Sequence, residues 1–347
     1  MSLPHEDAEP QPTTATGSSS PVPPVLGARQ VVGASLDLIL RSGDAMRQAS
    51  FYIGAIALAL IGPLALAVWG LVVVDPGTTL DPVSATALEG WFNLLLLLAL
   101  GGLLVAIVEA QGVAIAVLGG AYAGRPLDVR EAVQRSRMVF WSLVIALVIV
   151  SLPAALVRLA IGEATEQQVV LGLLAGIAVQ YPFVYAPAGI VLGGAGALEA
   201  LRRSVRIVGA RKVAALVVAV LPAAFGLLIG LGISAGIDLV IRAVDAVGLS
   251  RDSGSAGQAI LTALILVLVF ALGTLILTAS AIISAPQVVM FIGLTRAAAG
   301  LDAVRHGGSH ALATPGRRRF RWLPLPMRLA TGIGVIGVAA LLSLVSG

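Results

Sequence analysis

The chain contains no cysteine. This absence excludes disulfides, thiolate nucleophiles and cysteine-ligated zinc or iron–sulfur sites. Histidine is almost absent too, and its three copies, His5, His306 and His310, lie outside the long apolar segments. A histidine-based metal centre within a membrane is therefore excluded, and no Ser/His/Asp set or phosphate-binding loop is present. We expect no catalytic residues, no metal and no cofactor, and thus a protein that is not an enzyme.

Charged residues are scarce as well, at 12% of the 347 residues, whereas an average soluble domain has about a quarter. Hydrophobic residues make up 58% of the chain, and the mean hydropathy is +0.99. Apolar stretches near the ~20 residues that a bilayer requires recur along the chain. The sequence therefore predicts an all-α, polytopic transmembrane helical bundle. Its seven predicted spans cover residues 51–74, 91–118, 139–160, 169–194, 213–240, 258–293 and 328–346.

One short phrase recurs three times, each time just before an apolar segment. It consists of an acid, three residues and then Arg-Ser, and its copies begin at Asp37, Glu131 and Glu199. The acid and the arginine are four residues apart, so they share one face of a helix. We interpret each copy as a cytoplasmic helix that leads into a helical hairpin. This gives three hairpin repeats with six spans, followed by a seventh span.

The domain organisation follows from composition. Residues 1–30 are rich in Pro, Ser, Thr and acids, which is typical of a disordered tail, and their acidic start does not resemble a secretory signal. Residues 31–305 would form the six-span membrane domain with its three repeats. Residues 306–327 would be a basic cytoplasmic linker, and 328–347 the seventh transmembrane span.

The basic residues predict the orientation. If the N-terminus is cytoplasmic, nineteen of the 22 Lys and Arg residues fall in inside segments. Such an excess marks the cytoplasmic side of a membrane protein. We therefore expect a multi-pass protein of the cytoplasmic membrane, with the N-terminus inside and the C-terminus outside.

The inside arginines suggest a surface for lipid headgroups. In the repeats these are Arg41, Arg135 and Arg203, which would form a basic collar facing the phosphates. The last linker adds Arg317, Arg318, Arg319 and Arg321. The expected partners are the lipid bilayer and its anionic headgroups, or a membrane protein docked on the collar. Alternatively, these arginines are plain topology anchors. Nucleic-acid binding is not expected, because the inside arginines account for the isoelectric point near 10.1.

Two groups of polar residues interrupt the predicted spans. Glu109 and Gln111 lie in the second span, where an acid is costly and marks a functional candidate. Gln180, Tyr181 and Tyr185 surround Pro182 in the fourth span, where a broken helix could line a binding site. Each group also has a structural interpretation: Glu109 as an interfacial residue, and the prolines as simple kinks.

Two stretches resemble a known family. Residues 124–132 read Gly-Arg-Pro-Leu-Asp-Val-Arg-Glu-Ala, and residues 199–204 read Glu-Ala-Leu-Arg-Arg-Ser after Pro187-Ala188. Both are similar to the membrane domain associated with bacterial glycerophosphoryl diester phosphodiesterases. The resemblance covers about residues 30–305 and implies a membrane module. The catalytic barrel of that family has no counterpart here, so the resemblance implies no diesterase activity.

Two functions remain open at this point. The first is a non-enzymatic membrane module that acts as a scaffold or accessory subunit or in lipid handling, through its basic collar. The alternative is a small transporter or permease-like protein that uses Glu109 and the broken fourth span.

Overall fold

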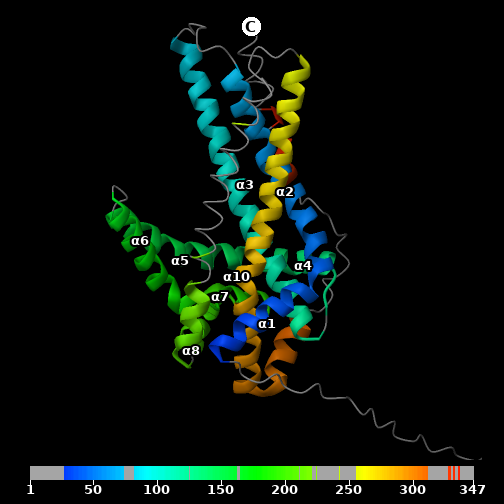
Figure 1. Ribbon diagram of the computed structural model, residues 1–347, viewed down its shortest axis with the longest axis vertical. Coiled ribbons are helices and arrows are strands. Elements are labelled where there is room, and N and C mark those ends of the chain that lie inside the picture. The colour runs from blue at the N-terminus through cyan, green and yellow to red at the C-terminus, as the bar shows by residue number, and fades with distance from the viewer. Residues whose placement is uncertain are drawn as a thin grey trace, which may run out of the picture.

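The computed structural model describes most of the chain as helices (Figure 1). The described residues are 27–73, 82–124, 126–161, 165–210, 212–220 and 255–311, with short pieces at 224, 242, 327–329, 331–332 and 335–336. Within them there is no strand, so the predicted all-α class is confirmed for this part of the chain. The predicted spans 213–240 and 328–346 lie largely outside the described residues, as do residues 1–26 and 312–326.

Five helices among the described residues are long and apolar enough to cross a membrane, which makes this chain a multi-pass membrane protein. The apolar segments are Gly43–Pro63, Leu96–Tyr122, Phe140–Ile161, Val170–Val191 and Thr262–Leu294. Each overlaps one of the predicted spans. The full count of seven spans and the three-repeat organisation remain predictions.

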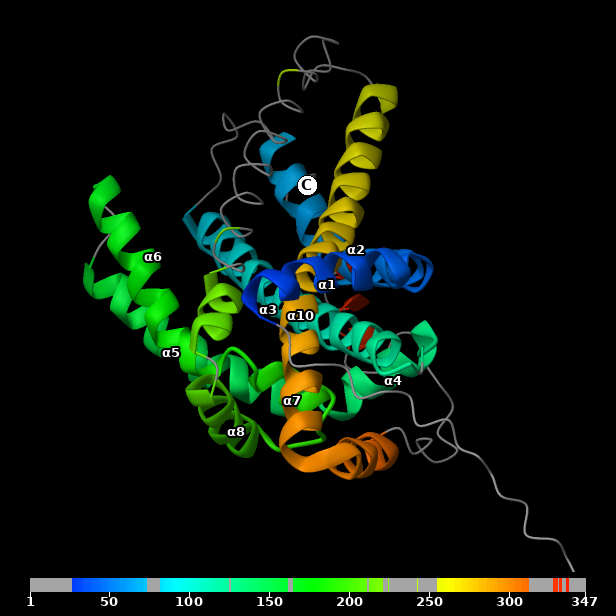
Figure 2. The ribbon, with the colours of Figure 1, turned by 60° about the horizontal axis from the view of Figure 1, so that its bottom comes forward.

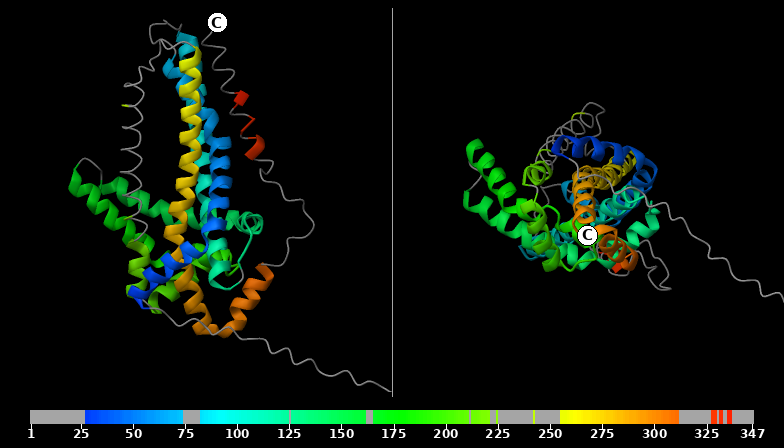
Figure 3. Two further views of the ribbon diagram at one scale, coloured as in Figure 1. Left: turned by 45° about the vertical axis from the view of Figure 1, so that its right-hand side comes forward. Right: turned by 90° about the horizontal axis from the view of Figure 1, so that it is seen from below.

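Three long helices form an upright bundle: α2 (Gly43–Val73), α3 (Pro82–Tyr122) and α10 (Ser255–Ala311), which run side by side in two views (Figures 1 and 3). Glycines let them approach closely. A Cβ at Gly54 of α2 would lie 2.8 Å from the ring of Phe270 on α10, and one at Gly102 of α3 would lie 2.8 Å from Cβ of Leu60. The apolar segment Thr262–Leu294 of α10 has 33 residues, about 50 Å at 1.5 Å per residue, which exceeds the thickness of the hydrocarbon core. Beyond it the orange end of α10 turns back at the bottom of the bundle (Figure 3).

Each Arg-Ser phrase belongs to a short helix that precedes an apolar one. These helices are α1 (Ala28–Arg41), α4 (Val129–Met138) and α8 (Ala197–Ala210). Helix α1 leads into α2, α4 leads into α5 (Phe140–Ile161), and α8 leads into helical residues 212–220. Asp128 starts α4, because its side chain accepts a hydrogen bond from the Val129 backbone N–H at 2.8 Å.

The second hairpin stands away from the upright bundle. Helix α5 pairs with α6 (Glu166–Gln180), and the two project sideways at a steep angle (Figures 1 and 2). Thr165 and Gln168 form a capping box that starts α6. After α6 the chain continues through the 3₁₀-helix η1 (Tyr181–Phe183) to α7 (Ala186–Val191), which returns to the bundle.

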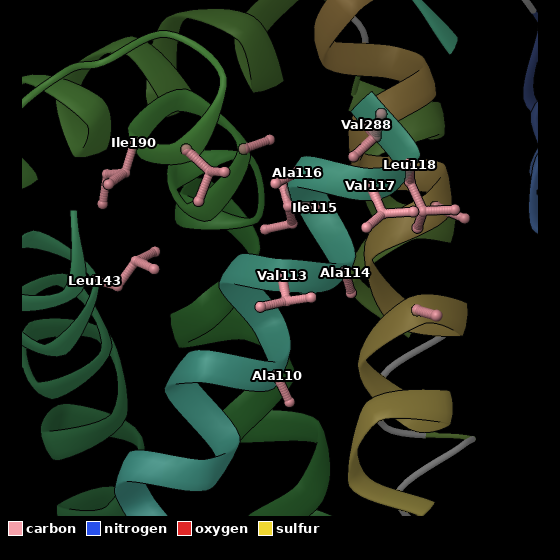
Figure 4. Close-up of a cluster of buried hydrophobic side chains, with 14 of the residues drawn as sticks. Ala110, Val113, Ala114, Ile115, Ala116, Val117, Leu118, Leu143, Ile190 and Val288 are labelled. Atoms are coloured by element: carbon pink, nitrogen blue, oxygen red, sulfur yellow. The ribbon is translucent and has the colours of Figure 1, made fainter. Parts of the chain in front are cut away.

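The core lies around the last turns of α3. Residues 113–118 are buried on all sides, with at most 2% of any side chain exposed. Figure 4 shows them next to Leu143 of α5, Ile190 of α7 and Val288 of α10. The preceding part of α3 is different, because Leu97, Leu100 and Leu104 are exposed, as expected of a lipid-facing surface. The centre of the fold is therefore where α3, α7 and α10 meet.

Candidate functional site

Glu109 lies at the centre of a polar cluster that joins three helices. The Tyr52 hydroxyl on α2 donates a hydrogen bond to Oε1 of Glu109 at 2.6 Å. Nε of Arg137 on α4 donates to the same oxygen at 3.0 Å, and the Arg137 guanidinium also donates to the Tyr52 hydroxyl at 2.6 Å. The glutamate side chain is 0% exposed. A buried carboxylate is thus held by one neutral and one cationic donor.

Local packing brings these residues together. Helices α2 and α3 are antiparallel neighbours, and their register places Tyr52 opposite Glu109, just as it places Leu60 opposite Gly102. The end of α4 fits against α3 at Gly112, where any Cβ would collide with the side chain of Ser136. The Ser136 hydroxyl donates weakly to the Glu109 backbone carbonyl at 3.4 Å. The contact of Ser136 with α3 places the next residue, Arg137, close enough for its guanidinium to reach Glu109.

The two oxygens of Glu109 are in unequal surroundings. Oε1 receives both donors, whereas Oε2 is buried and has no hydrogen-bond partner among the described residues. Glu109 lies thirteen residues before the end of α3, which is about 20 Å along the helix. Ionised side chains within an apolar membrane helix are costly and are normally paired. Arg137 supplies the compensating charge, and 20% of its side chain remains exposed.

Sequence reasoning identified Glu109 but missed Tyr52 and Arg137. An acid in an apolar helix requires a basic partner, and Arg137 is the last basic residue before the apolar segment of α5. The position of Arg137 could have suggested it as the partner of Glu109, but the two residues are 28 positions apart in the sequence. None of the described contacts of this cluster involves Gln111, which lies half-buried on α3.

Arg135 differs from the expectation that it faces headgroups. Only 4% of it is exposed, and its guanidinium donates to the carbonyls of Val191 at 2.6 Å and Leu192 at 3.2 Å. These carbonyls end α7 and have no partner within that helix, so a buried cation satisfies them. Arg135 and Glu131 share a face of α4, but the described hydrogen bonds of Arg135 go to α7 rather than to Glu131. Burial lowers the pKa of Arg135 to about 10, so the guanidinium remains charged at neutral pH.

Arg41 and Arg203, the other two repeat arginines of the collar hypothesis, are not buried. Arg41 pairs with Asp37 at 2.6 Å, and Arg203 pairs with Glu199 at 2.7 Å. The Arg41 side chain is 75% exposed and that of Arg203 is 36% exposed. Both pairs have the predicted spacing of four residues. The remaining collar candidates, Arg317, Arg318, Arg319 and Arg321, lie outside the described residues.

The predicted break in the fourth span is present, and a side chain of helix α8 bonds the backbone at the break. Helix α6 ends at Gln180, which is exposed, and the backbone re-forms as α7 after Tyr185. The Ser204 hydroxyl of α8 donates to the Pro182 carbonyl at 2.9 Å and accepts from the Tyr185 backbone N–H at 3.0 Å. The backbone groups that the break frees are therefore satisfied by a neighbouring helix.

Two tyrosines flank this break in different environments. The Tyr181 hydroxyl donates to the Lys212 carbonyl at 2.9 Å, which links η1 to the helical residues after α8. Tyr185 is 1% exposed, and its buried hydroxyl has no hydrogen-bond partner among the described residues. The polar residues around Pro182 thus lie in separate contacts, apart from the Glu109 cluster, and do not line one common site.

Two serines of the repeated phrase make contacts between helices. Ser136 packs on α3, and Ser204 packs on the segment between η1 and α7, so each contacts the return segment of the preceding hairpin. The run Val-Leu-Gly-Gly occurs at 117–120 and again at 191–194, at the ends of these two return segments. This repeat in the sequence could have identified the two segments as equivalent. Ser42, in the first copy, has a buried hydroxyl that lacks a described partner.

The described residues contain no group of three or more His, Cys, Asp or Glu side chains that could hold a metal ion. Comparison with known proteins gives no match to a family model, a curated protein or a solved structure. The function therefore has to be argued from the geometry.

Proposed function

We propose that the protein is a non-enzymatic module of the cytoplasmic membrane that is held in the headgroup layer by α1 and α8, and that it serves as a scaffold or in lipid handling. The observation that carries this proposal is an apolar stripe on the exposed face of α1, away from the rest of the protein. Val32, Leu36 and Leu40 recur every four residues and are 41%, 58% and 80% exposed. An apolar stripe on a short helix beside membrane spans suits the interface between headgroups and acyl chains.

The remaining surface of α1 fits the same position. Val31 and Leu38 are buried against the protein, so the exposed stripe is a second apolar face. The Asp37–Arg41 pair lies on the exposed polar side next to that stripe. Transfer of a leucine side chain from water into lipid contributes about 1.5–3 kcal/mol, and an arginine near an anionic leaflet about 1 kcal/mol. Since the following spans already tether α1, these terms suffice to hold it on the bilayer.

Helix α8 repeats this arrangement. Leu198 and Val205 are 63% and 45% exposed, whereas Leu201 and Val208 are buried against the protein. Arg202 and Arg206 are exposed, one turn apart, next to the exposed apolar residues. The resemblance to a phosphodiesterase-associated membrane domain, together with the lack of catalytic residues in the sequence, supports a role without chemistry of its own.

The position of α1 can be measured directly, because the natural chain has no cysteine. Single variants Leu36→Cys and Asp37→Cys would carry a fluorophore in nanodiscs of phosphatidylglycerol and phosphatidylethanolamine. We expect lipids brominated near the headgroup to quench the label at position 36 and iodide in the buffer to quench the label at position 37. Quenching of both labels by iodide alone would reject docking of α1 in the headgroup layer.

A small transporter or permease is the second candidate, and the fully buried Glu109 favours it. Intramembrane carboxylates are common in coupled transport. This candidate predicts that Glu109→Gln removes a growth or transport phenotype at a normal protein level. An unchanged phenotype would exclude an essential role of this carboxylate in transport.

A further inference from the structure

We propose that Oε2 of Glu109 binds a proton and that protonation releases Arg137 from the cluster. The site is the Tyr52–Glu109–Arg137 contact, and its ligand is a proton from bulk water. This proposal does not rest on headgroup docking or on transport. It concerns the buried carboxylate and its two donors alone.

The unequal surroundings of the two oxygens carry the argument. Oε1 accepts both the Tyr52 hydroxyl and the Arg137 guanidinium, while Oε2 is buried with no described donor. A carboxylate oxygen without a donor in an apolar environment carries an uncompensated desolvation penalty. Formation of an O–H bond at Oε2 removes the negative charge that burial penalises, and it breaks no covalent bond of the protein.

The neighbouring elements determine which groups respond. Among the described residues, Tyr52 on α2 and Arg137 on α4 are the ionisable groups that contact Glu109. Helix α10 has no ionisable side chain between Asp252 and Arg296, and α5 has none between Arg137 and Arg158. Tyr181 and Tyr185 precede α7, Arg135 donates to its last carbonyls, and Asp37 and Arg41 on α1 pair with each other. Protonation therefore raises the charge of this cluster by one, with Arg137 as its cation.

Arg137 has a route out of the cluster. Its side chain is already 20% exposed, and it is the next-to-last residue of α4, where that helix turns into α5. A neutral Glu109 no longer compensates the charge of the partly buried guanidinium, so the balance shifts toward contact of Arg137 with water or lipid phosphates. Because α5 and α6 pair mainly with each other, release of Arg137 loosens the attachment of this hairpin to α2 and α3.

Infrared difference spectroscopy on the full chain in nanodiscs tests the proton site. Acidification from pH 8 to pH 5 should produce the carbonyl band of a protonated, buried carboxyl group. We expect Glu109→Gln to abolish this band and Glu131→Gln to retain it, since Glu131 is an exposed acid on α4. Absence of the band from the unmodified protein, or its persistence in Glu109→Gln, would overturn the proposal.

The Arg137 variants separate a proton site from a purely structural pair and remain informative if Glu109→Gln does not fold. Arg137→Gln removes the compensating cation and should raise the midpoint of the carboxyl band by at least about one pH unit, a tenfold change in proton affinity. Arg137→Lys keeps the charge and should stay closer to the unmodified midpoint. An identical midpoint in all three proteins would overturn the coupling to Arg137.

The release step has its own readout. Spin labels at Met138→Cys on α4 and Leu100→Cys on α3, both exposed positions, report the separation of the two helices. We expect the distance distribution to broaden with the same midpoint as the carboxyl band and to be broad at every pH in Arg137→Gln. A distribution that does not change with pH would reject release. A growth phenotype that is unaffected by Glu109→Gln would reject transport and leave the proton site in place.

Discussion

Arg135 and Arg137 lie two residues apart on α4, yet they satisfy different parts of the protein. Arg135 donates to the last carbonyls of α7, and Arg137 donates to a carboxylate on α3. Both lie in a segment that the positive-inside pattern predicts to be cytoplasmic, and the collar hypothesis expected Arg135 to face headgroups. Their hydrogen bonds show that these two arginines hold helices together, whereas Arg41 and Arg203 remain at the surface.

At this scale we predict that Arg135→Gln destabilises the protein while Arg41→Gln does not. Loss of buried, charge-assisted hydrogen bonds costs about 1.5–3 kcal/mol each, and loss of an exposed ion pair costs about 0–1 kcal/mol. Denaturant unfolding in mixed micelles, followed by circular dichroism, measures the difference. Equal free energies of unfolding for the two variants would contradict the buried position of Arg135.

A second residue-scale prediction compares two serines of the repeated phrase. Ser204→Ala leaves the Tyr185 N–H and the Pro182 carbonyl without their partner and should cost about 1–3 kcal/mol. Ser42→Ala removes a buried hydroxyl that has no described partner and should be nearly neutral. The same unfolding measurement distinguishes them. A larger loss in Ser42→Ala would show that its hydroxyl has a partner outside the described residues.

At the scale of elements, the contact between α2 and α10 depends on small residues. Gly54 and Ala57 of α2 face Gly273 of α10, where an added Cβ would lie 2.7 Å from Cα of Gly54 and 2.7 Å from Cβ of Ala57. Without a hydrophobic driving force inside lipid, close packing of this kind is a main source of helix association. The sequence has so many glycines that this pair could not be selected without the structure.

We therefore predict that Gly273→Leu separates or distorts α2 and α10, at a cost of about 1–3 kcal/mol or more from overpacking. Gly101→Ala on α3 is the matched control, because nothing lies within 4 Å of its added Cβ. That control should be neutral or stabilising by about 0.5–1 kcal/mol, the usual advantage of alanine over glycine within a helix. Retention of folded protein after extraction in mild detergent, measured by size-exclusion chromatography, is the readout.

At the scale of the whole molecule, orientation is the property that charge predicts most directly. The three short helices α1, α4 and α8 each precede an apolar helix, and the segments predicted to lie inside contain nineteen of the 22 basic residues. We predict that Ser18→Cys in intact cells reacts with an impermeant maleimide only after permeabilisation, whereas Ser346→Cys reacts without it. The unmodified, cysteine-free chain is the control for both. Labelling of position 346 only after permeabilisation would place the C-terminus inside and reject the seven-span topology.

Apolar content and periodic phrases were sufficient to predict helices, five of the membrane-crossing segments and the break at Pro182. They also identified Glu109, because a lone acid within a run of leucine, valine and alanine is conspicuous. They did not predict its partners, because Tyr52 and Arg137 are separated from it by 57 and 28 residues and meet it only after α2, α3 and α4 pack. The collar hypothesis was wrong for Arg135 for the same reason.

The sequence by itself determined that the chain is helical and enters a membrane, since transfer free energies of apolar residues act locally and add along a segment. It also determined that cysteine and intramembrane histidine chemistry are absent. Only the tertiary structure decided which arginines are buried, which serines close a broken helix and which oxygen of Glu109 lacks a donor. These outcomes depend on how distant helices meet, because a hydrogen bond or ion pair forms only where packing brings both partners within about 3 Å.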